Sequence, residues 1–188
     1  MNQRSLVALV LLPLLGSALA GCSVPVQASP VVVRSVRPGS SPPSPAGSPQ
    51  PSVRVQAYFV QDGHLVALDR FVPAADGLAP SLSALAQPLT PAQSAAGVRS
   101  ALPTRLQGWT GRLRDTVAQV AVPTGFDRLS VPEQVLAVAQ VVFTVTANSY
   151  ASGVELLLGD RVVAMPDEDG QLVTGPLMRA DFARLSPP

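Results

Sequence analysis

The stretch SVPEQVLAVAQVVFTVTAN, Ser130–Asn148, decides the fold of this chain. Ser130 and Glu133 have the spacing of a capping box, in which the serine oxygen accepts from the amide three residues on and the glutamate reaches back to the serine amide. Pro132 is compatible with a first helical turn. The apolar residues that follow recur at the i, i+3, i+4, i+7 spacing of an amphipathic helix: Val135, Val138, Ala139, Val142 and Phe143. We therefore predict a helix in the core of a small domain.

This predicted helix is not a membrane span. It is only 19 residues long and carries Glu133, Gln134 and Gln140, whereas a span needs about 20 predominantly apolar residues. No residue on it has a pattern that indicates catalysis.

Upstream of the helix, the sequence predicts a β-hairpin. Val53–Val60 alternates apolar and polar side chains with period two, which is typical of a half-buried strand. Gln61–His64 contains Asp-Gly, the favoured pair for a tight hairpin turn, and a second strand follows over Leu65–Val72. Pro73 ends that strand because it cannot donate to the ladder.

The remaining segments complete one domain. We predict a helix over Pro80–Gln87, a short helical turn capped by Thr90 and Gln93, a loop over Ala95–Pro103, a loop or short edge strand over Leu106–Gly111, strands over Val117–Val122, Gly153–Leu158 and Arg161–Ala164, and a last short helix over Arg179–Leu185. Two main helices and about five strands over about 135 residues predict a single α+β domain, residues 53–186, with a mixed or antiparallel sheet.

Composition excludes several function classes. Charged residues make up 13% and the net charge is +1, so no charged surface recruits nucleic acid or an acidic substrate. Aromatic residues make up 4%, too few for stacking platforms on single-stranded nucleic acid. The single cysteine excludes an internal disulfide framework, and the single histidine excludes a two-histidine zinc site.

Residues 1–21 have the layout of a secretory signal peptide. Arg4 supplies the positive region, and Leu6–Leu15 is an apolar run interrupted only by a proline. Leu19-Ala20-Gly21-Cys22 resembles the lipobox of bacterial lipoproteins, which implies cleavage before Cys22 and a diacylglycerol on its thiol. Two or more acyl chains hold a protein stably on a bilayer where one does not. The alternative is an ordinary signal peptide, or an uncleaved anchor, with a chance cysteine.

Residues 22–52 are predicted to be the lipidated cysteine and a disordered linker. PGSSPPSPAGSPQPS, residues 38–52, is nearly all Pro, Ser and Gly, so it cannot bury enough apolar area to offset its ordering entropy. A linker of this length spans roughly 30 Å as a coil and about 90 Å as polyproline II. Such a tether holds a folded domain away from the membrane surface.

Several segments together resemble the GerMN domain of bacterial sporulation and envelope proteins. The matching segments, in order, are Val53–Val72, Leu82–Pro103, Val117–Ser130, Glu133–Thr146 and Met165–Leu185. The resemblance implies a ring-building-motif-like α+β fold that works through protein contacts and has no known catalytic machinery. One departure is Ala121, where the family often has an aspartate in the third strand.

Candidate sites are few. His64 follows Gly63 in a turn, where a solvated histidine is expected, and no Gly-x-Ser-x-Gly elbow accompanies it, although a Ser-His-Asp set is not excluded by sequence. Asp167–Asp169 lacks the spacing and terminal glutamate of a calcium loop.

Arg70 and Arg99 are the polar residues to test first for a partner contact, although each fits a plain surface charge. We predict no catalytic, cofactor-binding or metal-binding residue, and no cofactor.

The sequence is compatible with three functions. The leading hypothesis is a non-enzymatic lipoprotein, anchored through Cys22 on the extracytoplasmic face of the cell membrane, whose GerMN-like domain binds another envelope protein or itself. The alternative is a binder of a small ligand, such as a lipid or cell-wall glycan, in an apolar pocket lined by Val142, Phe143 and strand residues. A hydrolase is the third, and it requires His64 beside a serine and an acid.

Overall fold

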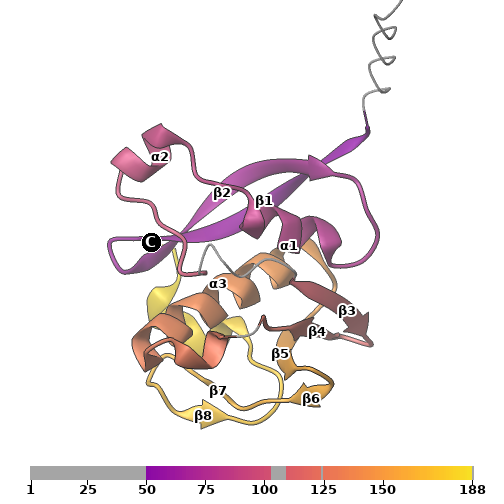
Figure 1. Ribbon diagram of the computed structural model, residues 1–188, viewed down its shortest axis with the longest axis vertical. Helices are drawn as coiled ribbons and strands as arrows, with labels where there is room; N and C mark the ends of the chain where they lie inside the picture. Colours follow the sequence, from indigo (N-terminus) through magenta and orange to yellow (C-terminus); the bar gives the residue numbers. More distant parts are fainter. Residues whose placement is uncertain (1–49, 103–108, 124, 188) are drawn as a thin grey trace, which may run out of the picture. The chain divides into compact units, whose positions relative to one another are not determined.

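The computed structural model describes residues 50–102, 109–123 and 125–187 (Figure 1). The predicted signal peptide, Cys22 and the linker up to residue 49 lie outside the described residues, as does the first half of Leu106–Gly111. None of the helices within the described ranges is long and apolar enough to cross a membrane.

The predicted hairpin is confirmed. Strands β1 (Ser52–Gln61) and β2 (His64–Pro73) pair antiparallel, with Gln61 opposite His64. Asp62 and Gly63 form the two-residue turn with φ of +50° and +82°, as a tight hairpin turn requires.

Two short helices follow the hairpin. Helix α1 (Ala79–Ala86) begins with a proline in its first turn and buries Leu82 and Leu85. Helix α2 (Pro91–Ala95) has the predicted capping box: the Gln93 amide donates to Thr90 Oγ1 at 3.2 Å, and the Thr90 amide donates to Gln93 Oε1 at 2.9 Å. Both helices therefore begin where their local sequence predicts.

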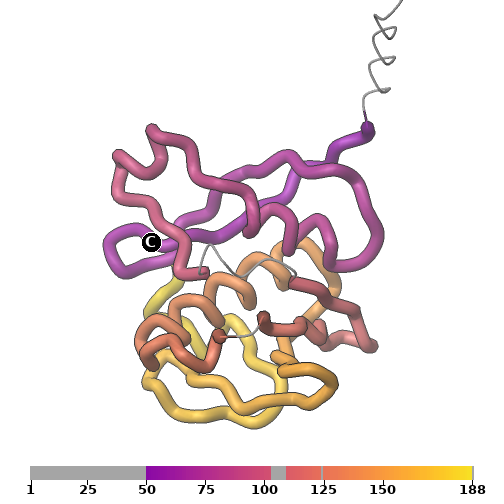
Figure 2. The backbone as a smooth tube through the Cα atoms, viewed as in Figure 1, coloured from indigo at the N-terminus to yellow at the C-terminus, as the bar shows by residue number. Residues whose placement is uncertain are grey.

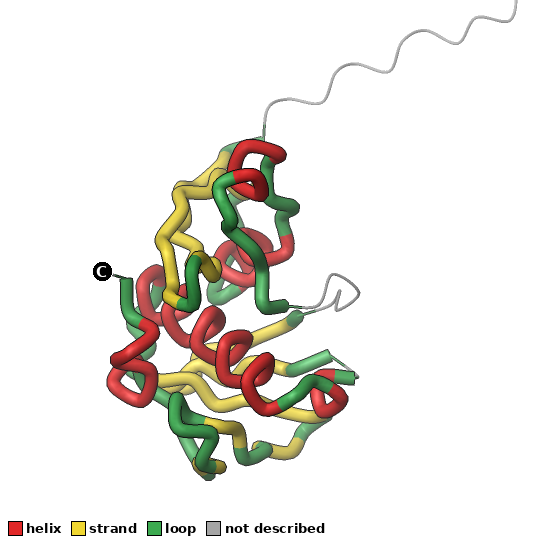
Figure 3. The backbone as a smooth tube through the Cα atoms, turned by 90° about the vertical axis from the view of Figure 1, so that its left-hand side faces the viewer, coloured by secondary structure: helices red, strands yellow, loops and turns green. Residues whose placement is uncertain are grey.

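The long helix α3 (Val131–Asn148) lies between the hairpin and a second sheet (Figures 2 and 3). Almost every residue from Val135 to Val145 is buried, including Val138 and Val142, which are fully inaccessible. The Glu133 carboxylate accepts from the Ser130 amide at 2.9 Å and from its hydroxyl at 2.6 Å, which fixes the first turn. Strands on both sides explain why the apolar face covers most of the helix.

The second sheet has the order β3-β4-β5-β6, with bounds Thr110–Arg114, Val117–Ala121, Gly153–Leu158 and Arg161–Val162. Strands β4 and β5 are parallel, and the other neighbours are antiparallel. The parallel pair needs a crossover, and α3 is that crossover. The α+β class with a mixed sheet is therefore confirmed, although the strands are divided among separate sheets rather than one.

Several short elements differ from the sequence prediction. Strand β3 runs from Thr110 to Arg114 and pairs with β4, whereas the sequence predicted a loop or short edge strand over Leu106–Gly111. All residues of β3 are exposed, so its sequence lacks the alternation that identifies a half-buried strand. β6 ends two residues early, and Met165–Pro166 (β7) pairs with Leu172–Val173 (β8), a pair too short for periodicity to reveal. Phe126–Arg128 (η1) is a 3₁₀ segment that was not predicted. Arg179–Leu185 (η2) has the bounds of the predicted last helix, but it is 3₁₀ and is kinked at Phe182.

The free edge of β1 is covered without a full strand. Val60 exchanges backbone hydrogen bonds with Arg99, at 2.9 and 2.8 Å. Thr144 Oγ1 accepts from the Tyr58 amide, and Asn148 bonds both the amide and the carbonyl of Gln56. Side chains of α3 thus satisfy backbone groups that an adjacent strand would otherwise pair.

Candidate functional site

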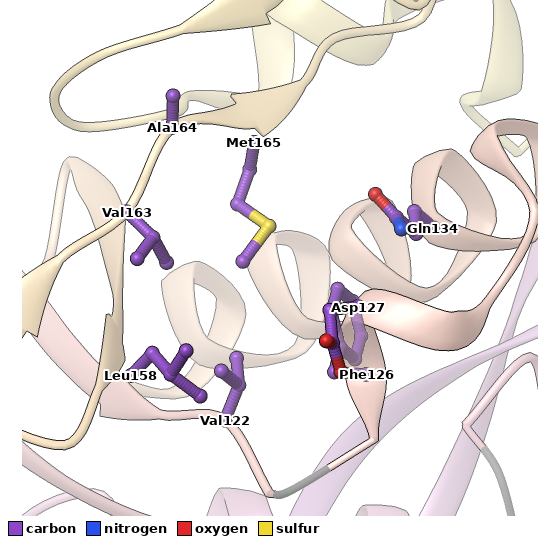
Figure 4. Close-up of a pocket in the computed structure, with 8 residues that line it drawn as sticks. All are labelled: Val122, Phe126, Asp127, Gln134, Leu158, Val163, Ala164 and Met165. Atoms are coloured by element: carbon purple, nitrogen blue, oxygen red, sulfur yellow. The ribbon is translucent and has the colours of Figure 1, made fainter.

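An apolar pocket of about 180 Å³ lies where the start of α3 meets the ends of β5, β6 and β7 (Figure 4). Its lining residues are Val122, Phe126, Asp127, Gln134, Leu158, Val163, Ala164 and Met165. Val122, Phe126 and Met165 are buried and form its floor. The pocket is half open to solvent, which makes it accessible to a side chain from outside.

Backbone contacts set the position of the lining residues. The Val122 amide donates to the Leu157 carbonyl at 2.8 Å, and the Val163 amide donates to the Leu156 carbonyl at 3.0 Å. Gly125 has φ of +95°, a conformation that favours glycine, and it turns the chain from Val122 into η1. The pocket is therefore built on strand ends and a defined turn.

Three exposed apolar side chains lie on elements that line this pocket or on the strand paired with one of them. Leu158 is 47% exposed, and Val131, one helical turn before Gln134, is 51% exposed. Leu172 lies opposite Pro166 in the β7–β8 pair and is 71% exposed. We call Val131, Leu158 and Leu172 the apolar rim.

One side of the pocket is polar. Asp127 and Gln134 lie opposite Val163 and Leu158 (Figure 4). The Gln134 amide nitrogen donates one of its two hydrogens to the Leu129 carbonyl at 2.9 Å, which leaves its Oε1 and one N–H for other contacts. Asp127 is exposed and contributes a carboxylate. This side of the pocket therefore presents hydrogen-bond acceptors.

The residues predicted to line a ligand pocket lie elsewhere. Val142 and Phe143 are buried and do not line the pocket described above. The Phe143 ring packs edge-on against Tyr58 with centroids 5.4 Å apart, and the Arg179 guanidinium lies 4.9 Å from the Phe143 centroid. Val142 and Phe143 are therefore core residues rather than residues that line a ligand pocket.

His64 is exposed at the first position of β2. Its Nδ1 lies 3.2 Å from the backbone oxygen of Asp62, and no side chain in the described part of the chain hydrogen-bonds to the ring. The described residues therefore bring no serine or acid to His64 in the arrangement that a triad requires.

The acidic turn is occupied by its own chain. Asp167 Oδ1 accepts from the amides of Asp169 and Gln171 at 3.0 and 2.9 Å. The Arg184 guanidinium of η2 binds both Glu168, at 3.1 Å, and Asp169. These carboxylates raise the pKa of Arg184, first through the Asp169 hydrogen bond. Over residues 50–102, 109–123 and 125–187, no cluster of His, Cys, Asp and Glu could hold a metal ion.

The two candidate arginines differ from each other. Arg99 is exposed and contacts Val60 through its backbone. The interpretation of Arg70 as a surface charge was wrong, because only 8% of it is exposed. Its Nη1 donates to the Pro88 carbonyl at 3.2 Å, and its guanidinium lies 4.9 Å from the Phe59 ring centroid. Desolvation lowers the pKa of Arg70. The alternation of residues in β2 does not predict this burial, because it results from tertiary packing.

The sequence did not identify the pocket. Its lining comes from five separate segments, and the residues of each have the pattern of ordinary core or turn positions. The available signal was the Gly-Phe pair after β4, which the GerMN resemblance included.

Comparisons with known proteins bear on the fold. The chain resembles the tandem GerMN domains of the sporulation protein GerM from Bacillus subtilis, with a TM-score of 0.55 and 19% identity, over 70% of this chain and 48% of that chain. It also resembles the first GerMN domain of that protein, with a TM-score of 0.52 and 20% identity, over 68% of this chain and 98% of that one. The match thus spans about half of the tandem structure. No family model and no curated protein matches the sequence. The chain has the GerMN fold, as its sequence predicted.

Proposed function

We propose that this protein is a non-enzymatic lipoprotein of the cell envelope whose GerMN-like domain binds another envelope protein. The observation that carries the proposal is an apolar pocket open to solvent on a GerMN fold, together with the exposed apolar rim residues on the elements that form the pocket and on the strand paired with β7. Exposed apolar side chains gathered beside a concavity are typical of protein interaction sites.

The location is proposed from the amino-terminal sequence. Leu19-Ala20-Gly21-Cys22 supports cleavage after residue 21 and acylation of Cys22. Residues 22–52 then tether the folded domain, residues 53–186, at the extracytoplasmic face of the membrane. Anchoring would confine the domain to partners near the bilayer.

The size of the pocket favours a docked side chain over a free ligand. Sites for drug-sized ligands are typically about 300–1,000 Å³. The pocket here is about 180 Å³, and six of its eight lining residues are apolar, so a glycan would find few polar contacts. A lipid chain would need a longer channel than this hollow provides. Partner docking is therefore the better-supported alternative.

Site-specific photocrosslinking in intact cells tests the proposal. A photoreactive residue at Leu172, on the apolar rim, is compared with one at Tyr150, which is 92% exposed just beyond the opposite end of α3. We expect a discrete crosslinked envelope protein from position 172 and not from position 150. Equal yields at both positions, or none at position 172, would contradict partner binding at this rim.

The same experiment separates a partner from self-assembly. Co-expression of two differently tagged copies shows whether the species crosslinked at position 172 contains a second copy of this chain. A crosslinked species that carries both tags would show that the partner at this rim is a second copy of this chain rather than another envelope protein.

A further inference from the structure

Resting on the proposed function, we infer that the partner inserts one aromatic side chain with a hydrogen-bond donor, tryptophan or tyrosine, into the pocket between η1, α3 and β5–β7. Three observations carry this assignment: the volume of the pocket, its apolar floor, and the acceptors on one side of it.

The volume suits one ring. An apolar cavity of roughly 150 Å³ is known to accommodate benzene. The pocket here is about 180 Å³, a volume that matches one aromatic side chain. Buried aromatic anchors in such pockets contribute much of the binding free energy in protein interfaces.

The floor provides favourable contacts for a ring. Phe126 is 2% exposed, and Met165, with its thioether, lies beside the pocket centre (Figure 4). Sulfur–aromatic and aromatic–aromatic contacts are both favourable in this arrangement. On another side, Phe126 already packs edge-on against Trp109, with ring centroids 6.2 Å apart at 88°.

The polar side selects a donor. Asp127 offers a carboxylate and Gln134 offers Oε1, while the Gln134 amide nitrogen is already bonded to Leu129. The lining side chains therefore offer mainly acceptors, the Asp127 carboxylate and Gln134 Oε1, against one remaining N–H of Gln134. An indole N–H or a phenolic O–H adds a hydrogen bond to one of these acceptors, whereas phenylalanine and leucine add none.

The methionines make the site directly observable. The chain has three methionines, and Met165 lines the pocket while Met178 is exposed outside it. In the full chain in detergent, with ¹³C-methyl methionine, N-acetyl-L-tryptophanamide is titrated and compared with the phenylalanine and leucine amides. A bound ring shifts the Met165 methyl resonance, and the Met178 methyl is the internal reference.

We expect a saturable Met165 shift with about tenfold tighter binding of the tryptophan probe than of the phenylalanine probe, the scale of one charge-assisted hydrogen bond. Asp127→Asn should reduce that preference, and Val163→Phe should remove the shift by filling the hollow. Asp62→Asn, a matched loss of charge in the β1–β2 turn, should change neither. The Met178 resonance reports whether each variant is folded.

Several results would overturn the inference. They are an unmoved Met165 methyl, an equal shift of Met178, or equal binding of the leucine probe. If crosslinking at position 172 succeeds while Met165 does not respond, partner binding stands and the aromatic anchor is wrong. If Met165 responds and no partner crosslinks, the pocket chemistry stands and the proposed function fails.

Discussion

Thr144 Oγ1 accepts a hydrogen bond from the backbone amide of Tyr58 at 2.9 Å, across 86 residues of sequence. Both residues are buried, so the hydroxyl satisfies an amide that water does not reach. With Asn148 one turn later, and with Gln140 bonding Ala101 and Ser100 one turn earlier, α3 presents a polar row at four-residue spacing to β1 and the loop beside it.

The first prediction concerns this hydrogen bond. Thr144→Val keeps the shape of the side chain but leaves the Tyr58 amide unsatisfied, so we expect a loss of about 1–3 kcal/mol in the free energy of unfolding. Thr144→Ser keeps the acceptor and should lose less. Chemical denaturation measures both, and hydrogen exchange should show faster exchange at the Tyr58 amide in the valine variant. Unchanged exchange there would contradict the role of Thr144.

The second prediction concerns the core face of α3. Val142 is fully buried, so Val142→Asp places a charge in an apolar interior and should unfold the domain. Val131→Asp puts the same change on an exposed position of the same helix and should leave the domain folded. Far-UV circular dichroism with a thermal scan compares them. A soluble, folded Val142→Asp protein would contradict the burial of Val142 in the core.

The third prediction concerns Arg70. Its Nε and Nη2 are buried and have no hydrogen-bond partner within the part of the chain that the structure describes. Removing an incompletely compensated buried charge commonly leaves stability unchanged or raises it. We therefore expect Arg70→Met to raise the thermal midpoint by a few degrees, on the order of 1 kcal/mol. Arg54→Met, at an exposed arginine on β1, is the comparison. A large drop specific to Arg70→Met would indicate that Pro88 and Phe59 compensate its charge fully.

The fourth prediction is a pH dependence. The hydrogen bond from the Ser130 hydroxyl, followed by that from the Ser130 amide, lowers the pKa of Glu133. Because the folded pKa is below the unfolded one, the contribution to stability is present above the unfolded pKa, about 4.3, and is lost as the pH falls through the folded pKa. Ser130→Ala should raise the pKa of Glu133 and shrink this effect. Carboxyl ¹³C NMR titration of both proteins measures it, and identical titration midpoints would exclude the cap as the cause.

The fifth prediction concerns the anchor. Radiolabelled palmitate should be incorporated into the wild-type protein and not into Cys22→Ala, because the thiol is the proposed attachment point. Val142→Asp should still be labelled, since the signal lies upstream of the folded domain. Equal incorporation in Cys22→Ala would remove the lipid anchor from the proposal.

Local sequence information predicted most of the elements. The hairpin turn, the Thr90–Gln93 capping box and the start of α3 each depend on residues within a few positions of one another, and all are confirmed. Strand β3 was predicted only as a possible edge strand with other bounds, and the β7–β8 pair was not predicted. Their residues show no periodic burial, and they are strands only through their partners. The pocket was missed for a similar reason, since its lining is assembled from five segments.

The sequence by itself therefore determined that Ser130–Asn148 is a capped, largely buried helix in an α+β domain, because capping and the 3.6-residue period are local properties. Tertiary structure alone decided that this helix lies between two sheets and completes the edge of β1 with Thr144 and Asn148. It also decided that Arg70 is buried and that Phe126 and Met165 share a pocket. These are contacts between residues far apart in the chain, and only the packing of the complete domain brings them together.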